Sequence, residues 1–238
     1  MSEKKIAIVT GAGSGIGRST ALLLAEAGYT TVLVGRTESK LEETAKLIAE
    51  ESPDAQTMVH AADVTDEEAV QALIDAVVEK HERIDVIANV AGYAPLGPIA
   101  RLETDEYRKC LAANLDSVVF MTRAAWPVFK KQKSGFIANV SSMASVDPFT
   151  GFNVYGAAKA GVNLFTKATA DEGKRIKLNA VAVGPGAVET EMLRDNFSEK
   201  AIPKDMTLDP AEVAAVIRDC ITGDRDFERG ETILLASH

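Results

Sequence analysis

Short runs of β-branched and apolar residues alternate with longer amphipathic stretches along most of this chain. Such alternation is typical of parallel strands joined by helical crossovers. An apolar run without polar interruption, as at 6–9, favours a sheet that is covered by helices on both faces. We expect strands over 6–10, 31–34, 57–60, 86–89, 136–140, 178–183 and 232–235. We expect helices over 15–27, 39–51, 66–80, 105–131, 153–172 and 209–221.

The 238 residues contain no internal repeat, no Gly/Ser-rich linker and no shift in composition that would mark a second domain. The sequence therefore predicts an α/β protein with a doubly wound parallel sheet, the Rossmann fold, as a single domain over 1–238. Two helix starts carry capping signals: Ser39 with Glu42 predicts a capping box for the second helix, and Asp209-Pro210 predicts the start of the last helix.

Composition excludes several classes of function. A net charge of −9 argues against a nucleic-acid surface, which needs a clustered positive field. Cys110 and Cys220 are isolated, which favours buried thiols over a disulfide or a metal site. The three histidines are scattered, so we expect no metal centre and no histidine-based triad. The apolar run at 6–9 is too short for a signal peptide or a membrane span, which predicts a cytoplasmic protein without membrane contact.

Glycines gather between the first expected strand and helix, in the stretch Thr10-Gly-Ala-Gly-Ser-Gly-Ile-Gly17. Glycine permits a tight turn and lets the backbone approach a pyrophosphate, and the following helix N-terminus presents unpaired N–H groups. The common dinucleotide fingerprint fails in register, because Ile16 stands where a glycine would be required; the pattern T-G-x-x-x-G-x-G fits instead. We expect cofactor contacts at Gly11, Ser14, Ile16 and Gly17.

Tyr155 and Lys159 are four residues apart in an expected helix, so their side chains share one face. A lysine ammonium beside a phenol favours the phenolate and lowers its pKa, which makes tyrosine useful as a general acid or base. The alternative is a surface tyrosine that packs on a lysine stem.

Polar or glycine-containing stretches that follow three expected strands favour the catalytic interpretation. They are Ser141-Ser142, Asn89-Val90-Ala91-Gly92, and Pro185-Gly186 with Thr190 just beyond. Ligands of open α/β sheets sit at the carboxyl ends of strands, which is where all three fall. A hydroxyl after the strand over 136–140 is placed to bind a substrate oxygen.

Taken in order, these stretches make the chain resemble the short-chain dehydrogenase/reductase family from Lys5 to about Thr190. The resemblance implies that Tyr155 exchanges a proton with a substrate oxygen that Ser142 holds. It implies that Lys159 lowers the tyrosine pKa and binds the nicotinamide ribose. It also implies that Asn114 holds a helix bend and a water molecule that links Lys159 to solvent.

The same resemblance implies the remaining cofactor contacts. Asp63 and Val64 would flank the adenine, and Val188 and Thr190 would flank the nicotinamide carboxamide. Further contacts are expected at Asn89, Ala91, Gly92, Tyr155, Lys159, Pro185 and Gly186.

The turn after the second strand bears on the choice of cofactor. An NAD site of this architecture normally has an acidic residue at the strand end, which repels a 2′-phosphate. That position is Gly35, and Arg36 follows it, whose guanidinium suits a phosphate. Ser14 departs from NADP-linked relatives, many of which have a basic residue there. We expect a preference for NADP(H), with NAD(H) as the alternative.

The chain departs from the family in three places. Val90 replaces a usual asparagine, the usual C-terminal glycine pair is absent, and the segment over 192–207 is a short substrate lid that suggests an open pocket. The second departure leaves a homodimer and a homotetramer open. Assembly through the helices over 105–131 and 153–172 is expected from the resemblance. Apolar positions there are Val118, Met121, Ala125, Val128, Val162 and Phe165.

The leading interpretation is an NADP(H)-dependent oxidoreductase that interconverts a carbonyl and an alcohol. The alternatives are an NAD-dependent alcohol dehydrogenase of the same fold and a non-catalytic cofactor-binding regulator. The full set of Asn114, Ser142, Tyr155 and Lys159 argues against the last, because a pure binder does not need all four. The sequence does not name the small-molecule substrate. Candidate pocket residues, which favour a partly apolar one, are Tyr93, Met143, Phe149, Phe152, Ala187 and Met192.

Overall fold

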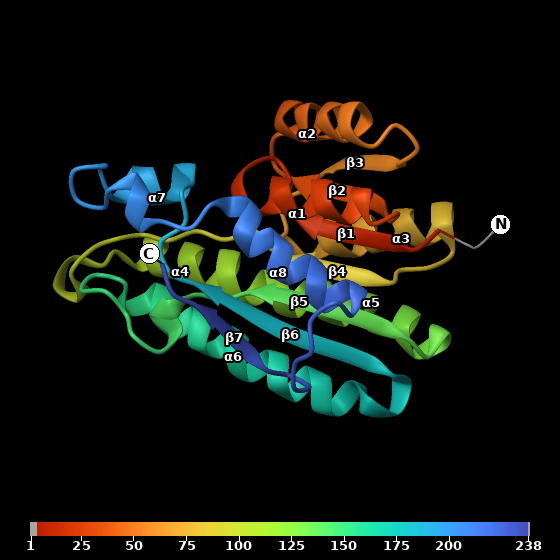
Figure 1. Cartoon of the computed structure of the whole chain (residues 1–238). Coiled ribbons are helices and arrows are strands. Elements are labelled where there is room, and N and C mark those ends of the chain that lie inside the picture. The colour runs from red at the N-terminus through yellow and green to blue at the C-terminus, as the bar shows by residue number, and fades with distance from the viewer. Residues whose placement is uncertain (1–3, 238) are drawn as a thin grey trace.

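A single parallel sheet of seven strands, in the order β3-β2-β1-β4-β5-β6-β7, forms the centre of the molecule (Figure 1). The computed structural model describes residues 4–237. The strands are β1 (Ile6–Thr10), β2 (Thr30–Gly35), β3 (Thr57–Ala61), β4 (Val86–Asn89), β5 (Gly135–Val140), β6 (Leu178–Pro185) and β7 (Thr232–Leu235). The order reverses between β1 and β4, which lie side by side with Ile8 paired to Ile87. This is the doubly wound Rossmann architecture that the sequence predicts.

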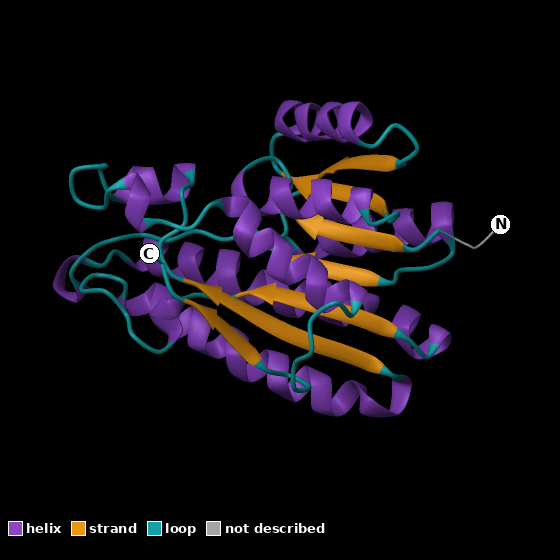
Figure 2. Ribbon diagram, in the orientation of Figure 1, coloured by secondary structure: helices purple, strands orange, loops and turns teal. Residues whose placement is uncertain are grey.

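Helices cover both faces of the sheet (Figure 2). They are α1 (Gly15–Glu26), α2 (Glu38–Glu51), α3 (Glu67–His81), α4 (Thr104–Leu111), α5 (Ser117–Gln132), α6 (Asn153–Gly173), α7 (Glu191–Asn196) and α8 (Pro210–Thr222). One face packs against α1, α2 and α8, and the other against α3, α5 and α6.

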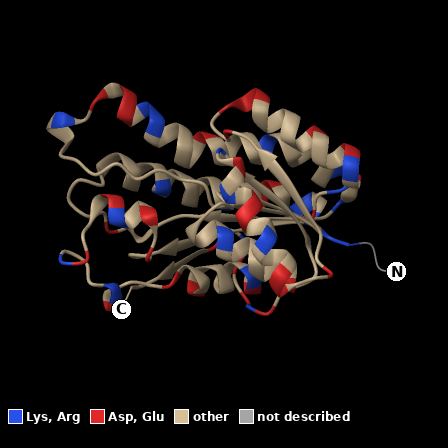
Figure 3. Cartoon of the chain, turned by 90° about the horizontal axis from the view of Figure 1, so that it is seen from above, with Lys and Arg blue, Asp and Glu red and all other residues tan. Residues whose placement is uncertain are grey.

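The strands in the middle of the sheet form because they are apolar on both sides. In β1, Ile6 and Ile8 join the core under α3 and α5, while Ala7 and Val9 join the core under α1 and α2. None of the seven strands contains a Lys, Arg, Asp or Glu, and Figure 3 shows these residues spread over the helices and loops instead. A strand buried on both faces has no place for a charge.

Every expected strand and helix is present, with boundaries one or two residues away from the prediction, except that the helix expected over 105–131 is interrupted. A π-helical turn, Ala112–Asp116, separates α4 from α5. Asn114 in this turn is fully buried, and its Nδ2 donates to the Cys110 carbonyl at 2.8 Å and to the Tyr93 carbonyl at 2.6 Å. The bond to Tyr93, which lies outside the helix, accounts for the interruption. The sequence did not predict it, because the hydrophobic periodicity of a helix gives no sign of a contact with a residue outside that helix. Helix α7 also had not been expected, because six residues are too short for a periodic signal.

One of the two predicted capping signals is wrong. Helix α2 begins at Glu38, so Ser39 lies inside its first turn, and the N-cap Thr37 makes no side-chain capping bond. The capping signal for α8 is confirmed: the Asp209 carboxylate accepts from Ala211 N at 2.8 Å, and Glu212 Oε2 accepts from Asp209 N at 2.6 Å.

The prediction of residues that join two subunits is also wrong at most positions, because the side chains are buried within one chain. Those buried inside the chain's own core are Val118, Met121, Ala125 and Val162. Val128 packs partly on that core, and Phe165 is half-buried. The apolar side chains that these helices leave exposed are those of Tyr107 and Leu164. The predicted stripe therefore faces the sheet rather than a second copy.

Both cysteines are free and buried, as predicted. Within residues 4–237, no helix is long and apolar enough to span a membrane. Over the same residues, no cluster of three or more His, Cys, Asp or Glu side chains is arranged to hold a metal ion.

Phe129 of α5 is the largest side chain in the core that is fully buried, and its ring lies against Gly135 at the start of β5. We expect Phe129→Ala to lower the free energy of unfolding by about 3–5 kcal/mol, because it removes buried area and leaves a cavity. Leu164→Ala on α6, whose side chain is 71% exposed, is the control and should change stability by less than about 0.5 kcal/mol. Chemical denaturation measures both, and equal effects would contradict this description of the core.

Candidate active site

A cleft of about 640 Å³ opens where the strand order reverses, at the carboxyl ends of the strands. The turns that follow β1, β2, β3 and β4 supply most of its lining, and the segment Thr190-Glu191-Met192 closes it from the side of α7. Crevices of this kind, at a topological switch point, are where open α/β sheets bind ligands.

The glycine-rich turn forms one wall of the cleft, and three of its glycines are required by the geometry. Gly11 and Gly15 have positive φ angles of 67° and 50°. A Cβ atom on Gly17 would lie 2.1 Å from the Gly11 carbonyl oxygen, and one on Gly11 would lie 3.1 Å from the backbone of Ala91. The turn therefore presses the start of α1 against the end of β4. It leaves backbone N–H groups at a helix N-terminus facing the cleft, an arrangement that suits a phosphate.

Most of the expected cofactor contacts line this cleft: Gly11, Ser14, Ile16, Gly17, Arg36, Asp63, Val64, Ala91, Gly92 and Thr190. Tyr155, Lys159, Pro185, Gly186 and Val188 do not line it; Pro185 ends β6 and Val188 is buried.

Asn89, expected to contact the cofactor, lies below the cleft with its side chain buried. Its Nδ2 donates to Asn139 Oδ1 at 2.8 Å, and Asn139 in turn donates to Thr166 Oγ1 at 2.8 Å. The Asn89 side chain therefore links β4, β5 and α6 in the interior and is not exposed to the cleft.

Two cations line the end of the cleft beyond β2. Arg36 is exposed and makes no hydrogen bond or ion pair with any described residue. Lys40, in the first turn of α2, lines the same cleft, and its Nζ lies 2.9 Å from Glu191 Oε2 on α7. Sequence reasoning had not selected Lys40, although a second basic residue soon after Arg36 was the available signal.

Tyr155 and Lys159 lie on one face of α6, as expected. A hydrogen bond with Ser142 lowers the pKa of Tyr155, but burial outweighs it and raises this pKa to about 12. Ser142 Oγ accepts from Ala144 N at 3.1 Å, which fixes the serine side chain at the end of β5. The nearby lysine was expected to lower the Tyr155 pKa, but this pKa is raised overall. The phenol is therefore protonated at neutral pH.

Lys159 is buried, with 3% of its surface exposed, and its Nζ donates to the Val140 carbonyl at 2.7 Å. Burial lowers the pKa of this ammonium to about 8. Its Nζ lies 5.7 Å from the centre of the Tyr155 ring. The positive charge is therefore near the phenol without being bonded to it.

Asn114 and this ammonium both lie next to Gly92. A Cβ atom on Gly92 would lie 2.8 Å from Asn114 Oδ1 and 3.7 Å from Lys159 Nζ. Gly92 lines the cleft, so the three residues connect the cleft to the Tyr155 neighbourhood. The structure thus brings together all four side chains that the resemblance selects as catalytic.

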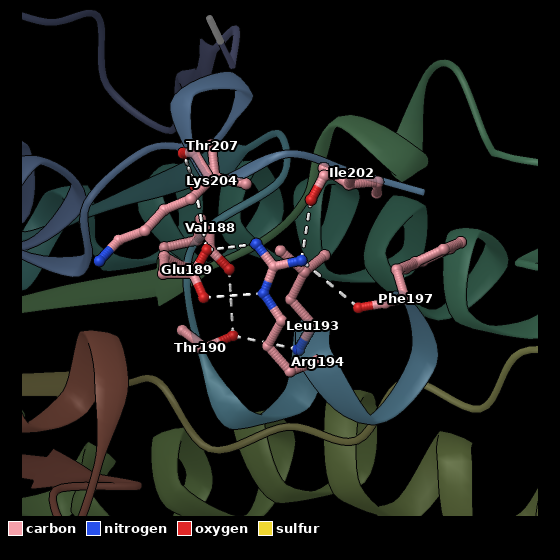
Figure 4. Close-up of polar contacts among 9 residues, drawn as sticks. All are labelled: Val188, Glu189, Thr190, Leu193, Arg194, Phe197, Ile202, Lys204 and Thr207. Atoms are coloured by element: carbon pink, nitrogen blue, oxygen red, sulfur yellow. Dashed lines mark hydrogen bonds and ion pairs between the residues drawn. The ribbon is translucent and has the colours of Figure 1, made fainter. Parts of the chain in front are cut away.

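The expected lid over 192–207 is tied down at its base by Arg194 (Figure 4). The Arg194 guanidinium binds both carboxylate oxygens of Glu189, with Nε 2.8 Å from Oε1, and its Nη1 donates to the Ile202 carbonyl at 2.8 Å. Arg194 thereby lowers the pKa of the Glu189 carboxyl. The planar guanidinium thereby connects Glu189, which precedes the segment, with Ile202 near its end. Sequence patterns had not indicated these contacts.

Comparison with known proteins agrees with this geometry. The family model described as short chain dehydrogenase matches residues 5–201. An uncharacterized oxidoreductase of Listeria monocytogenes is 33% identical over 240 residues, covering 96% of this chain and 95% of the relative. The 3-oxoacyl-[acyl-carrier-protein] reductase FabG of Thermotoga maritima is 33% identical, with coverage of 97% and 96%.

Two solved structures have the same fold over almost their whole length. Levodione reductase superposes with a TM-score of 0.91 at 27% identity and covers 98% of this chain and 96% of its own. An alcohol dehydrogenase from the archaeon Thermococcus sibiricus, complexed with 5-hydroxy-NADP, superposes with a TM-score of 0.88 at 26% identity, with coverage of 99% and 97%.

The lowered pKa of Lys159 makes a testable contribution to stability. From about pH 8 upward the folded state has released a proton that the unfolded lysine, with its ordinary pKa of 10.5, still holds, so raising the pH favours folding. Relative to Lys159→Met, the wild type should gain up to about 3 kcal/mol in unfolding free energy between pH 8 and 10.5. Urea denaturation of both proteins across this range measures the difference. A difference independent of pH would show that Lys159 is not a buried cation.

Proposed function

The chain belongs to the short-chain dehydrogenase family, and we propose that it is an NADP(H)-dependent oxidoreductase that interconverts a carbonyl and an alcohol. It is an enzyme that acts on CH–OH or C=O groups with a nicotinamide cofactor. The observation that carries the finer proposal is the meeting of Ser142, Tyr155 and Lys159 next to a glycine-walled cleft. The family assignment leaves little support for a non-catalytic regulator.

The cleft fits a dinucleotide in both shape and charge. Side chains at Gly11 and Gly17 would fill the turn or collide with the backbone, so this wall can only be bare backbone. We propose that this wall and Ser14 hold the pyrophosphate, and that Asp63 and Val64 flank the adenine. Lys159 and Thr190 would hold the nicotinamide end. When bound, the cofactor supplies or accepts the hydride, and the protein supplies orientation and the proton.

We propose that Tyr155 is the proton donor during carbonyl reduction. A phenol with a pKa near 12 has its proton at neutral pH, so it is ready to give that proton to an alkoxide as the alkoxide forms. Ser142, whose oxygen already accepts a backbone N–H, has one hydroxyl proton, which is shared with Tyr155 here and would turn to the same substrate oxygen. The Lys159 charge stabilises the phenolate that remains. Alcohol oxidation would use the same residues in reverse, and high pH would favour it.

The preference for NADP(H) is supported by the charges beyond β2. Gly35 provides no carboxylate to repel a 2′-phosphate, and Arg36 is exposed in the cleft without a partner among residues 4–237. Lys40 adds a second cation there, which offsets the absence of a basic residue at Ser14. Enzymes of the family use NAD(H) or NADP(H), and the Thermococcus relative was solved with an NADP derivative. An NAD-dependent alcohol dehydrogenase is the alternative.

We further propose a homo-oligomer whose interface lies elsewhere than at the buried positions that the sequence suggested. The choice between dimer and tetramer and the cytoplasmic location stay predictions.

Tyr155→Phe tests the proposed chemistry directly. The variant keeps the ring and loses the hydroxyl group that carries the proton, so kcat on a confirmed substrate should fall by about 10²–10⁴-fold while the affinity for the cofactor changes little. Tyr107→Phe on α4, 43% exposed, is the matched control and should keep full activity. Steady-state kinetics and cofactor fluorescence titration measure the two quantities. A Tyr155→Phe variant with a kcat near that of the wild type would rule out the mechanism.

Two substitutions test the choice of cofactor. Arg36→Ala should weaken NADPH binding by about 10–100-fold, because a charge-assisted bond to phosphate is lost, and should leave NADH binding nearly unchanged. Gly35→Asp should shift the preference toward NADH. Arg175→Ala, an exposed arginine after α6, is the control. A wild-type kcat/KM that is higher with NADH than with NADPH would contradict the NADP(H) assignment.

A further inference from the structure

Large apolar side chains that the fold leaves exposed gather in the segments that follow β4, β5 and β6. Of the nine in the described part of the chain, six belong to these segments: Leu96, Ile99, Val146, Phe149, Met192 and Met206. Their exposed fractions run from 37% to 67%. Isolated exposed apolar residues are ordinary, but a group of them marks a binding surface.

The three segments are hydrogen-bonded to one another, so we group the exposed side chains that they carry as one apolar surface. Gly97 N donates to the Gly151 carbonyl at 3.2 Å, and Asn153 Nδ2 donates to the Gly97 carbonyl at 3.2 Å. Asn196 on α7 donates to the Ala94 carbonyl at 2.8 Å. The segment after β4 is therefore held between the other two.

A series of aromatic rings leads from this surface to the proposed proton donor. Phe149, which is 65% exposed, lies 6.3 Å from Phe197 between ring centres. Phe197 meets Phe152 edge to face at 5.9 Å, and Phe152 lies 5.3 Å from Tyr155. Edge-to-face packing is a favoured geometry for aromatic rings, and a further apolar ring or chain can extend it.

Arg194, Asn153 and Asn196, which lie close in sequence to Phe152 or Phe197, are already bonded within the protein. Arg194 Nη1 lies 3.4 Å from the Phe197 carbonyl, but its guanidinium is paired with Glu189 (Figure 4). The amides of Asn153 and Asn196 donate to backbone carbonyls. A phosphate or carboxylate on the substrate would have to compete for Arg194, whereas a hydrocarbon group would replace water on the rings.

Building on the proposed function, we propose that the substrate is an uncharged ketone or secondary alcohol whose reacting carbon belongs to an apolar ring or hydrocarbon chain. This apolar part packs on Phe149, Phe152 and Phe197 while the oxygen reaches Ser142 and Tyr155. Sugars, phosphorylated compounds and short carboxylates are poor substrates in this account.

Cyclohexanone and tetrahydropyran-4-one test the proposal, because they share ring size and carbonyl and differ by one CH₂ replaced with oxygen. We expect kcat/KM with NADPH to favour cyclohexanone by about tenfold, since a buried methylene is favourable and a buried ether oxygen is costly. Phe197→Ala should reduce this preference to about twofold, mainly through KM, and Phe197→Leu should restore at least half of it. Leu164→Ala is the control and should keep the full preference.

A binding measurement separates this proposal from the proposed function. Saturation-transfer NMR on the protein with NADP⁺ should detect cyclohexanone more strongly than tetrahydropyran-4-one, and Phe197→Ala should remove the difference. If no carbonyl is reduced, the proposed function is wrong, while the NMR result still decides which class of compound the rings bind.

Three results would overturn the substrate class. They are an equal or higher kcat/KM for tetrahydropyran-4-one or glyceraldehyde, an equal effect of Phe197→Ala on both ring ketones, and a smaller assembly for Phe149→Ala by light scattering. The last would make this surface an interface between copies of the chain.

Discussion

The buried ammonium of Lys159 is the constraint around which the candidate active site is arranged. Its Nζ donates to the Val140 carbonyl at the end of β5, and no carboxylate in the described part of the chain forms an ion pair with it. A charge in this position is costly, which its lowered pKa reflects, so the surrounding structure has to hold it. The absence of a side chain at Gly92 leaves room for Asn114 and the ammonium, and the π-helical turn at Asn114 fixes that side chain through Tyr93. The π-helical turn and the buried charge therefore meet in the neighbourhood of Tyr155.

The topology of the sheet gives this arrangement its position. Because β1 and β4 are neighbours and their following helices lie on opposite faces, the turns after them separate and leave the cleft. The glycine turn lines one side, and the β4 turn leads through Gly92 to Lys159. Binding of a dinucleotide and proton transfer can then occur at one edge of the sheet. The segment after β6, tied by the Arg194–Glu189 pair, completes that edge on the substrate side.

The fold was predictable because the strands are uncharged and the helices strongly periodic, and Tyr155 and Lys159 were found from their spacing and from the strand ends near them. Features that depend on contacts between distant segments were not. The break at Asn114 depends on Tyr93, and the Arg194 pair depends on how the segment after β6 folds back. The prediction of interface residues was wrong for another reason. A hydrophobic stripe shows which face of a helix is apolar, but not what covers that face. Met121 and its neighbours on the stripe are covered by the chain's own sheet.

We propose that the chain transfers a hydride to a carbonyl carbon while Tyr155 gives the proton to its oxygen. NADPH carrying deuterium on either face of the nicotinamide C4 tests this directly, with cyclohexanone as the acceptor and NMR of the alcohol product. We expect one of the two labelled cofactors to place deuterium on the carbinol carbon and to slow turnover, whereas the other should do neither. Alcohol formed without deuterium from either cofactor, or no alcohol from any carbonyl while NADPH is bound, would contradict it.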